Sequence, residues 1–400
     1  MDVTMIQHPV GQGGMFSGTV CIGGAALRWV YDCGSNQQDR LSAEVRLVAD
    51  GGPIHLLFLS HLDSDHVNGV DRLLAATEVR EVVLPYLSAT EFALALVQDA
   101  ASGSLSGTFL EFVADPAKWL IRRGVDTVSF IKTIDEIQPD REMRLPDLAG
   151  EPIRGNDNGP LEIVWPPSMV KKRAAKKGNV QDIAAGATAG IITGARKIDW
   201  LFSPYAHKPS KARMARFTAA LKDAFGKVLS RAEIVREARN QEGREKLKLC
   251  YEQIWTDHNK VSMSLYAGPY GKPNISIVDL PFSDWRHNRS ATLAEVGWLM
   301  TGDADLCSFR RINSFLTYYK IIEDRVGVFV LPHHGSYLSF HPDLLHQFKG
   351  IYACLAVAGP NQYDHPHDCV RRHVNEVCGA HTWHHVSEQS DSGFGFRVTI

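Results

Sequence analysis

The feature that most constrains this chain is a polar stretch that directly follows an apolar run. Residues 54–59 (IHLLFL) are rich in branched and aromatic side chains, as expected of a strand buried on both faces. Four groups able to ligate a metal then fall within six residues: His61, Asp63, Asp65 and His66. Because ligands gather at the carboxyl ends of strands in α/β proteins, the pattern predicts a site between a strand and the helix that follows it.

Composition places few further limits on the fold. The chain has 400 residues, 44% of them hydrophobic and 22% charged, which suits one large domain with insertions or two smaller ones. Its 7 cysteines are odd in number, scattered and free of C-x-x-C spacing, so neither a disulfide framework nor a thiolate zinc site is indicated. No leader pattern and no apolar stretch of membrane-spanning length occurs, so we expect a cytoplasmic protein without a membrane partner.

Apolar runs and breakers predict alternating strands and helices. Residues 3–32 are typical of an antiparallel meander, and a helix at 69–77, a strand ending at Pro85 and a helix from Thr90 follow. The stretch 170–197 combines a charge run with small residues and predicts a mobile or partly helical insertion.

The net charge of −2 hides a basic segment. Between Ser168 and Cys250 there are 19 Lys and Arg against 7 Asp and Glu, a net charge of +12. This excess indicates either contact with the phosphates of a nucleic acid or polyphosphate, or a solvated helical face. The candidate contact residues are Lys171, Lys172, Arg173, Lys176 and Lys177.

Three later polar clusters also follow apolar runs. WLMTGD ends at Asp303, VFVLPHH at His333 and His334, and LAVAGPNQYDH at His365. Two divalent ions about 3.5 to 4 Å apart can activate a water and neutralise charge in ester hydrolysis, and they need a bridging anion. A carboxylate such as Asp303 suits that role, and imidazoles with further carboxylates, but no thiolate, suit zinc or manganese.

The ordered motifs VGQGG, VYDCGSN, HLDSDH at residues 61–66, NKVS, LMTGD, PHHGS and GPNQYDHP resemble the metallo-β-lactamase superfamily, in which a loop of pattern H-x-H-x-D-H follows a buried strand. We call residues 61–66 the metal loop. More narrowly, the chain is similar to the branch that contains the hydrolase domain of the DNA-uptake protein ComEC and the phosphorylcholine esterases, in which the second His of this pattern is Asp, here Asp63. The resemblance implies an αββα four-layer sandwich. It also implies a single domain over residues 1–400, with a basic, partly helical insertion at about 168–250.

The resemblance also implies roles for the clustered residues. His61 and Asp63 would bind one ion, Asp65 and His66 the other, and Asp303 would bridge them. A late ligand would be His334, with His333 facing the substrate phosphate, although these two roles are open to exchange.

Other residues have weaker expectations attached to them. Asp32 would support the metal loop from beneath. His258 is a candidate ligand, or Asn259 takes its place as in the ComEC-like branch, and His365 would protonate a leaving group or serve a structural turn. The opening turn reads GQGG where the family often has Asp, so that carboxylate has no counterpart here.

These features predict a metal-dependent hydrolase with two divalent ions, in which a metal-bound hydroxide attacks a phosphodiester of a nucleic acid or nucleotide. One alternative is hydrolysis of a small ester, phosphorylcholine-like or a lactone, which leaves the basic segment unexplained. The other is a binding or scaffold protein with a degenerate site.

Overall fold

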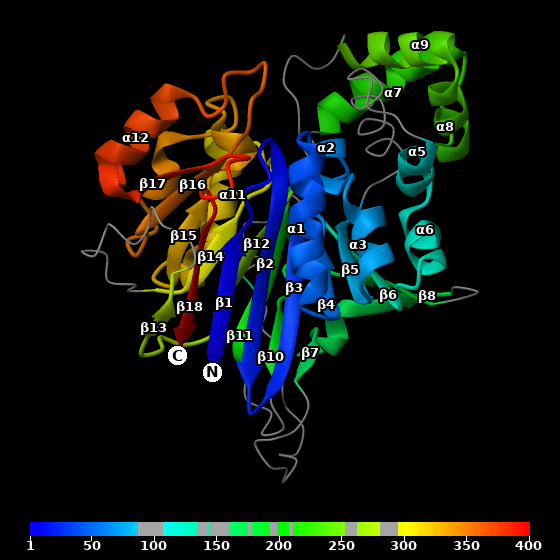
Figure 1. Ribbon diagram of the computed structural model, residues 1–400. Helices are drawn as coiled ribbons and strands as arrows, with labels where there is room; N and C mark the ends of the chain where they lie inside the picture. The colour runs from blue at the N-terminus through cyan, green and yellow to red at the C-terminus, as the bar shows by residue number, and fades with distance from the viewer. Residues whose placement is uncertain are drawn as a thin grey trace.

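The protein contains two β-sheets packed face to face, with helices on their outer surfaces (Figure 1). This computed structural model describes residues 1–86, 107–133, 143, 161–174, 178–192, 198–207, 211–252, 262–280 and 295–400. The predictions that fall on Thr90, His258, Asn259, Lys176 and Lys177 lie outside these residues.

The first sheet has ten strands within the described ranges, in the order β13-β18-β1-β2-β3-β4-β5-β6-β9-β8. Their bounds are β1 Asp2–Gln7, β2 Gly13–Ile22, β3 Ala25–Ser35, β4 Ile54–Phe58, β5 Val79–Pro85, β6 Thr127–Ile131, β8 Val170–Arg173, β9 Asn179–Ile183, β13 Ser276–Asp279 and β18 Phe394–Thr399. Strands β1, β2 and β3 form the predicted antiparallel meander, and β3, β4, β5, β6 and β9 run parallel.

The second sheet has eight strands in the described part of the chain, in the order β17-β16-β15-β14-β12-β11-β10-β7. Their bounds are β7 Glu162–Val164, β10 Ala189–Ile192, β11 Ile198–Ala206, β12 Met263–Pro269, β14 Gly297–Met300, β15 Val326–Val330, β16 Ala353–Val357 and β17 Trp383–Val386. Strands β14 to β17 are parallel, so their carboxyl ends meet along one edge of the sheet.

An aromatic core holds the two sheets together. Trp29 of β3 contacts Trp200 and Phe202 of β11, with ring centroids 5.6 and 5.0 Å apart. All three side chains are fully buried between the sheets. Burial of aromatic side chains this large dominates core energetics, so this cluster fixes how the sheets face each other.

Helices cover both outer faces. On the first sheet lie α1 Gln38–Asp50, α2 Ser64–Val67, α3 Val70–Ala76, α5 Gly107–Ala114 and α6 Pro116–Arg122, with α7 Lys211–Phe225, α8 Arg231–Arg239 and α9 Gln241–Glu252 beside them (Figure 1). On the second sheet lie α11 Phe309–Tyr319 and α12 Asp368–Cys378. Short 3-10 turns are Pro167–Met169, Lys320–Ile322, Pro332–Gly335, Pro342–Leu345 and Ala380–Thr382. The predicted αββα sandwich is confirmed.

The expectation that the stretch 170–197 is partly helical is wrong for its described residues, most of which lie in strands β8, β9 and β10. The described part of the charge run, Lys171 to Arg173, lies on β8, the last strand of the first sheet, and exposed lysines on an edge strand disfavour edge-to-edge pairing. The small residues of this stretch suggested an irregular or helical segment, but Ala189 lies in strand β10 and is buried between the sheets. Among the described residues of the basic segment, the α-helices are α7, α8 and most of α9.

The described helices include none that is both long and apolar enough to cross a membrane.

One hydrogen bond links the two sheets beneath the polar site. The hydroxyl of Tyr31, on β3, donates to the backbone oxygen of Met263, on β12, at 2.7 Å. Burial raises the pKa of this phenol well above its ordinary value, so the hydroxyl remains a donor.

We expect Tyr31→Phe to lower the free energy of unfolding by about 1 to 3 kcal/mol, because it leaves a buried carbonyl without its donor. Denaturant unfolding followed by fluorescence measures this difference. Tyr270→Phe is the matched control, because Tyr270 is 43% exposed, and it should change stability by less than about 0.5 kcal/mol. Equal stabilities of the Tyr31 variant and the wild type would contradict the role of this bond.

Candidate metal centre

The residues of the metal loop lie where strand β4 ends. Leu56, Leu57 and Phe58 are fully buried in β4, and the chain then passes through His61 to the short helix α2. Asp63 is the residue before the first turn of α2, and Asp65 and His66 lie inside that helix. The strand, polar loop and helix predicted from the sequence are therefore present.

The later clusters follow three neighbouring parallel strands of the second sheet. Asp303 follows β14, His333 and His334 follow β15, and His365 follows β16. Parallel neighbours end at the same edge, so the chain brings these groups to one place. That edge faces the metal loop of the first sheet.

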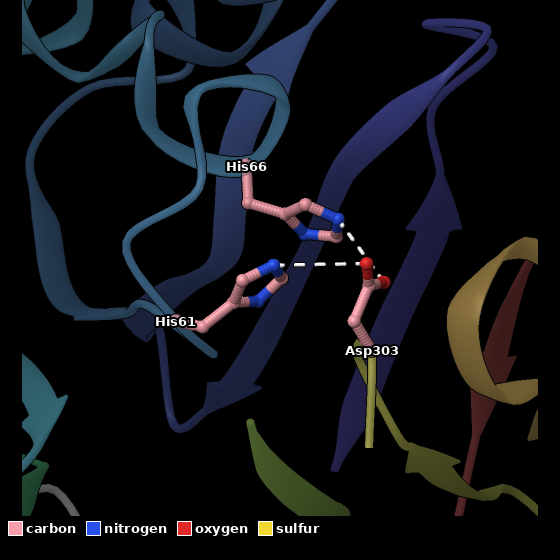
Figure 2. Close-up of side chains that lie close together, drawn as sticks. All are labelled: His61, His66 and Asp303. Atoms are coloured by element: carbon pink, nitrogen blue, oxygen red, sulfur yellow. Dashed lines mark ion pairs between the residues drawn. The ribbon is translucent and has the colours of Figure 1, made fainter. Parts of the chain in front are cut away.

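Asp303 lies at the centre of the cluster. Its Oδ1 is 3.3 Å from His66 Nε2 and 3.7 Å from His334 Nε2. Its Oδ2 is 3.7 Å from His61 Nε2 and 3.7 Å from His333 Nε2. Figure 2 shows His61 and His66 converging on this carboxylate from the metal loop. Each of the two carboxylate oxygens of Asp303 therefore faces a different pair of imidazoles.

Two overlapping groups bring ligand atoms within coordination range of a metal. His61, His66 and Asp303 form one, and Asp65, His66 and His334 form the other. They share His66, whose single available nitrogen can serve only one ion. Asp63 Oδ2 lies 3.5 Å from His61 Nε2 and Asp65 Oδ2 lies 3.6 Å from His334 Nε2, so one ion could lie beside His61 and Asp63 and the other beside Asp65, His66 and His334.

Asp32 fixes the orientation of two imidazoles. Its carboxylate accepts hydrogen bonds from His66 Nδ1 at 2.9 Å, from the Ser60 hydroxyl at 2.7 Å and from the Ser60 backbone N–H at 2.6 Å. Because the Ser60 hydroxyl donates to Asp32, it accepts from His61 Nδ1 at 2.8 Å. The Nδ1 protons of His61 and His66 are thus both engaged, which leaves Nε2 to present its lone pair.

The Nδ1 proton of His334 is also engaged in a hydrogen bond, in this case to the backbone. Its Nδ1 donates to the carbonyl oxygen of Val357 at 2.7 Å, so its lone pair is also on Nε2. Among the residues that the structure describes, the Nε2 atoms of His61, His66 and His334 are buried and have no hydrogen-bond partner. Imidazoles oriented by a second hydrogen bond are the usual form of metal ligands. The residues present therefore fit divalent metal ions.

Glycines allow the first sheet to approach the loop closely. A Cβ atom added to Gly34 would lie 2.5 Å from the carbonyl carbon of His66, and one added to Gly13 would lie 2.3 Å from the carbonyl oxygen of Asp65. Real Cβ atoms essentially never come within 3.0 Å of another heavy atom. Gly13 of VGQGG and Gly34 of DCGS are thus required for the packing of strands β2 and β3 beneath the metal loop.

Several site residues have a left-handed backbone. Asp32, His333 and His334 have φ values of 58°, 48° and 58°, a region that non-glycine residues rarely adopt. Such strain is held by the surrounding structure and concentrates at functional sites.

Charges in the cluster are strongly coupled. Burial disfavours the Asp303 carboxylate, but His334, His66 and His333 hold its pKa well below its usual range. Burial also disfavours the His66 imidazolium, but Asp303, Asp32 and Asp65 raise its pKa well above the ordinary value. In the absence of metal, protons on the imidazoles compensate the carboxylates, and a bound cation would replace them.

His333 and His365 differ from the buried ligands. The His333 side chain is 16% exposed against 4% for His334, and its Nδ1 lies 3.0 Å from the Ser339 hydroxyl. The His365 ring lies 5.1 Å from the His333 ring, and burial together with His333, His334 and His367 lowers its pKa to about 3. His365 is therefore a neutral imidazole beside the cluster.

The structure brings Asp32, His61, Asp63, Asp65, His66, Asp303, His333, His334 and His365 together. Lys171, Lys172 and Arg173 lie away from them on β8, where Arg173 pairs with Asp182. Sequence reasoning missed the supporting hydroxyls of Ser60, Ser262 and Ser339. The hydroxyl of Ser262 accepts from the backbone N–H of Asp303 at 3.0 Å, and this serine is the last residue of the NKVS motif. Only its place in that motif could have indicated it.

Residues 20–163 match the sequence model of the metallo-beta-lactamase superfamily. The matched range contains Asp32 and the whole metal loop. Fold and match together support this superfamily. Its members are mostly hydrolytic enzymes, which supports a metal-dependent hydrolase. No curated protein matches the sequence.

We expect the purified metallo-β-lactamase-like protein to bind about two divalent ions per chain. Asp65→Ala and Asp303→Ala should lose metal while keeping the fold, because each removes a carboxylate that faces the imidazoles. Elemental analysis after reconstitution, with circular dichroism on the same samples, measures both. Asp71→Asn, at an exposed carboxylate on α3, is the control and should keep its metal. Wild-type metal content in both alanine variants would refute the assignment.

Proposed function

We propose that the protein is a two-metal phosphodiesterase acting on a nucleic acid or a nucleotide. The observation that carries the proposal is the position of Asp303, whose two carboxylate oxygens face two different pairs of imidazoles. A carboxylate bridging two closely spaced cations is the arrangement used for in-line displacement at phosphorus. A degenerate binding site would not need the imidazoles to be oriented by Asp32, Ser60 and Val357.

The ligand assignment follows from the contacts in the cluster. The first ion would be held by His61 and Asp63, the second by Asp65, His66 and His334, and Asp303 would bridge them. When bound, two divalent ions supply a nucleophilic water at neutral pH and neutralise charge on the phosphoryl oxygens. The imidazoles with their Nδ1 protons engaged need no rearrangement to serve, so the chain is preorganised for this role.

Two histidines would act on the substrate. His333 is held by Ser339 at the edge of the cluster, where its N–H can stabilise charge on a phosphate oxygen. His365 is neutral and adjacent, so it can donate a hydrogen bond to the departing oxygen, or a water does so. Neither role requires these residues to leave their positions.

The narrower assignment is to the branch of ComEC-like hydrolases and phosphorylcholine esterases. Its support is Asp63, which stands at the second histidine of the loop, together with the PHHGS and GPNQYDHP motifs. Oxygen and nitrogen ligands without a thiolate suit both zinc and manganese.

The exposed lysines of β8 support a polymeric substrate. Lys171 and Lys172 are exposed on the last strand of the first sheet, four strands from β4. At ~4.8 Å per strand, this separates them from the axis of β4 by about 19 Å across the sheet. A nucleotide bound at the metal centre would not reach them, whereas a nucleic acid strand several nucleotides long would.

The test is a substrate panel with manganese or zinc added. It contains bis-p-nitrophenyl phosphate, single-stranded DNA, RNA, cyclic dinucleotides, p-nitrophenyl phosphorylcholine and a lactone. We expect hydrolysis of at least one nucleic acid or cyclic dinucleotide, and its abolition by Asp303→Ala. Hydrolysis of only the lactone or p-nitrophenyl phosphorylcholine would replace this proposal with the small-ester alternative, and no turnover by metal-loaded protein would favour a binding protein.

Changing His333 or His334 to alanine should have different effects on metal content and on turnover. His334→Ala should lower metal content and activity together, because its buried Nε2 faces Asp65 and Asp303. His333→Ala should keep the metals and lose roughly 10²-fold in kcat, the usual scale for one charge-stabilising donor. Metal content and turnover are measured on both variants. The opposite pattern would exchange the two roles.

If the basic segment contacts phosphates, binding of DNA or RNA should weaken steeply with salt. Replacing Lys171, Lys172, Lys176 and Lys177 with Gln should flatten the slope of log affinity against log salt by about 3. Arg173 is left intact because it pairs with Asp182. Lys320→Gln with Lys349→Gln is the control outside the segment. An unchanged slope would indicate that these lysines do not contact phosphates and are only exposed to solvent.

A further inference from the structure

Large side chains are exposed next to the metal centre. Tyr337 and Tyr363 are each 52% exposed and Leu338 is 44% exposed. They lie in the loops that follow β15 and β16, the strands that also deliver His333, His334 and His365. Exposed aromatic groups that gather at the edge of a polar site are typical of ligand contact.

The rings form a continuous series from the cluster to the surface. His333 contacts His365 with ring centroids 5.1 Å apart, and His365 stacks on Tyr363 at 5.7 Å with an interplanar angle of 30°. His365 also lies 5.0 Å from His367, whose ring meets the edge of Tyr337 at 4.7 Å. We call Tyr337, Tyr363, His365 and His367 the aromatic rim.

Hydrogen bonds hold the loop of the rim in place. The Asn361 side chain donates to the carbonyl oxygens of Gly359 and His365 at 2.9 and 2.8 Å. Its own amide oxygen accepts from the backbone N–H groups of Tyr363 and His365 at 2.9 and 3.1 Å. This explains the asparagine of GPNQYDHP, and it means that binding to the rim costs little ordering of the loop.

We infer that the aromatic rim is a subsite for a nucleobase of the substrate, next to the phosphodiester held at the metal centre. This inference rests on the proposed function. All nucleobases stack on aromatic side chains, because each base has a flat π-face, so stacking does not depend on the nucleotide sequence. A cage for a quaternary ammonium surrounds its ligand with rings, whereas His365 and Tyr363 stack on each other and form an open platform.

The test compares a dinucleotide with its abasic analogue, in which both bases are replaced by hydrogen. Tyr363→Ala and Tyr337→Ala should each raise KM for the dinucleotide about tenfold. They should change kcat less than twofold and leave the abasic analogue unaffected. Tyr363→Phe and Tyr337→Phe should restore the wild-type KM, because the ring is kept. Tyr270→Ala is the matched control, since Tyr270 is exposed at the far end of β12 from Ser262.

Calorimetric binding of the same two ligands to metal-free protein gives a readout independent of turnover. Equal losses for the dinucleotide and the abasic analogue, or none for either, would overturn the subsite while leaving the proposed function intact. A loss confined to p-nitrophenyl phosphorylcholine would overturn it in favour of a cation subsite. Failure of the metal-loaded wild type to hydrolyse any nucleic acid or nucleotide of the panel would instead refute the proposed function.

Discussion

The site depends on one buried carboxylate and the four imidazoles around it. Asp303 is 2% exposed, and burial of a charged group is tolerated only when it is paired and hydrogen-bonded. The compensating groups come from both sheets: His61 and His66 from the loop after β4, and His333 and His334 from the turn after β15. The aromatic core between the sheets and the bond from Tyr31 to Met263 hold these two edges at the distance that the cluster requires.

The supporting residues have a common purpose, which is to leave Nε2 of each buried imidazole directed toward Asp303. Asp32 is in a left-handed conformation, and from there it accepts from both Ser60 and His66. The close approach of β3 to the loop needs glycine at position 34. The left-handed backbone of Asp32 and the glycine at position 34 thus both serve to orient the imidazoles of the metal loop. This orientation makes the cluster suitable for cations.

Much of this could be predicted from the sequence because the clues are local. The first part of the site is indicated by His61, Asp63, Asp65 and His66, which directly follow a buried strand in the sequence. Three later strands that are also followed by polar residues indicate the remaining site residues. The orienting partners could not be predicted in the same way, because the bond from His334 to Val357 joins residues 23 positions apart and depends on how two strands end. The strands at 170–197 were missed for a related reason: a charge run on an edge strand is indistinguishable in sequence from a solvated loop.

In the proposed two-metal centre, Asp303 would bridge two cations. Anomalous diffraction from crystals grown with manganese or zinc tests this bridging role. We expect two peaks about 3.5 to 4 Å apart, one beside each carboxylate oxygen of Asp303, with His61 at one peak and His334 at the other. A single peak, or two peaks that Asp303 does not touch, would contradict it.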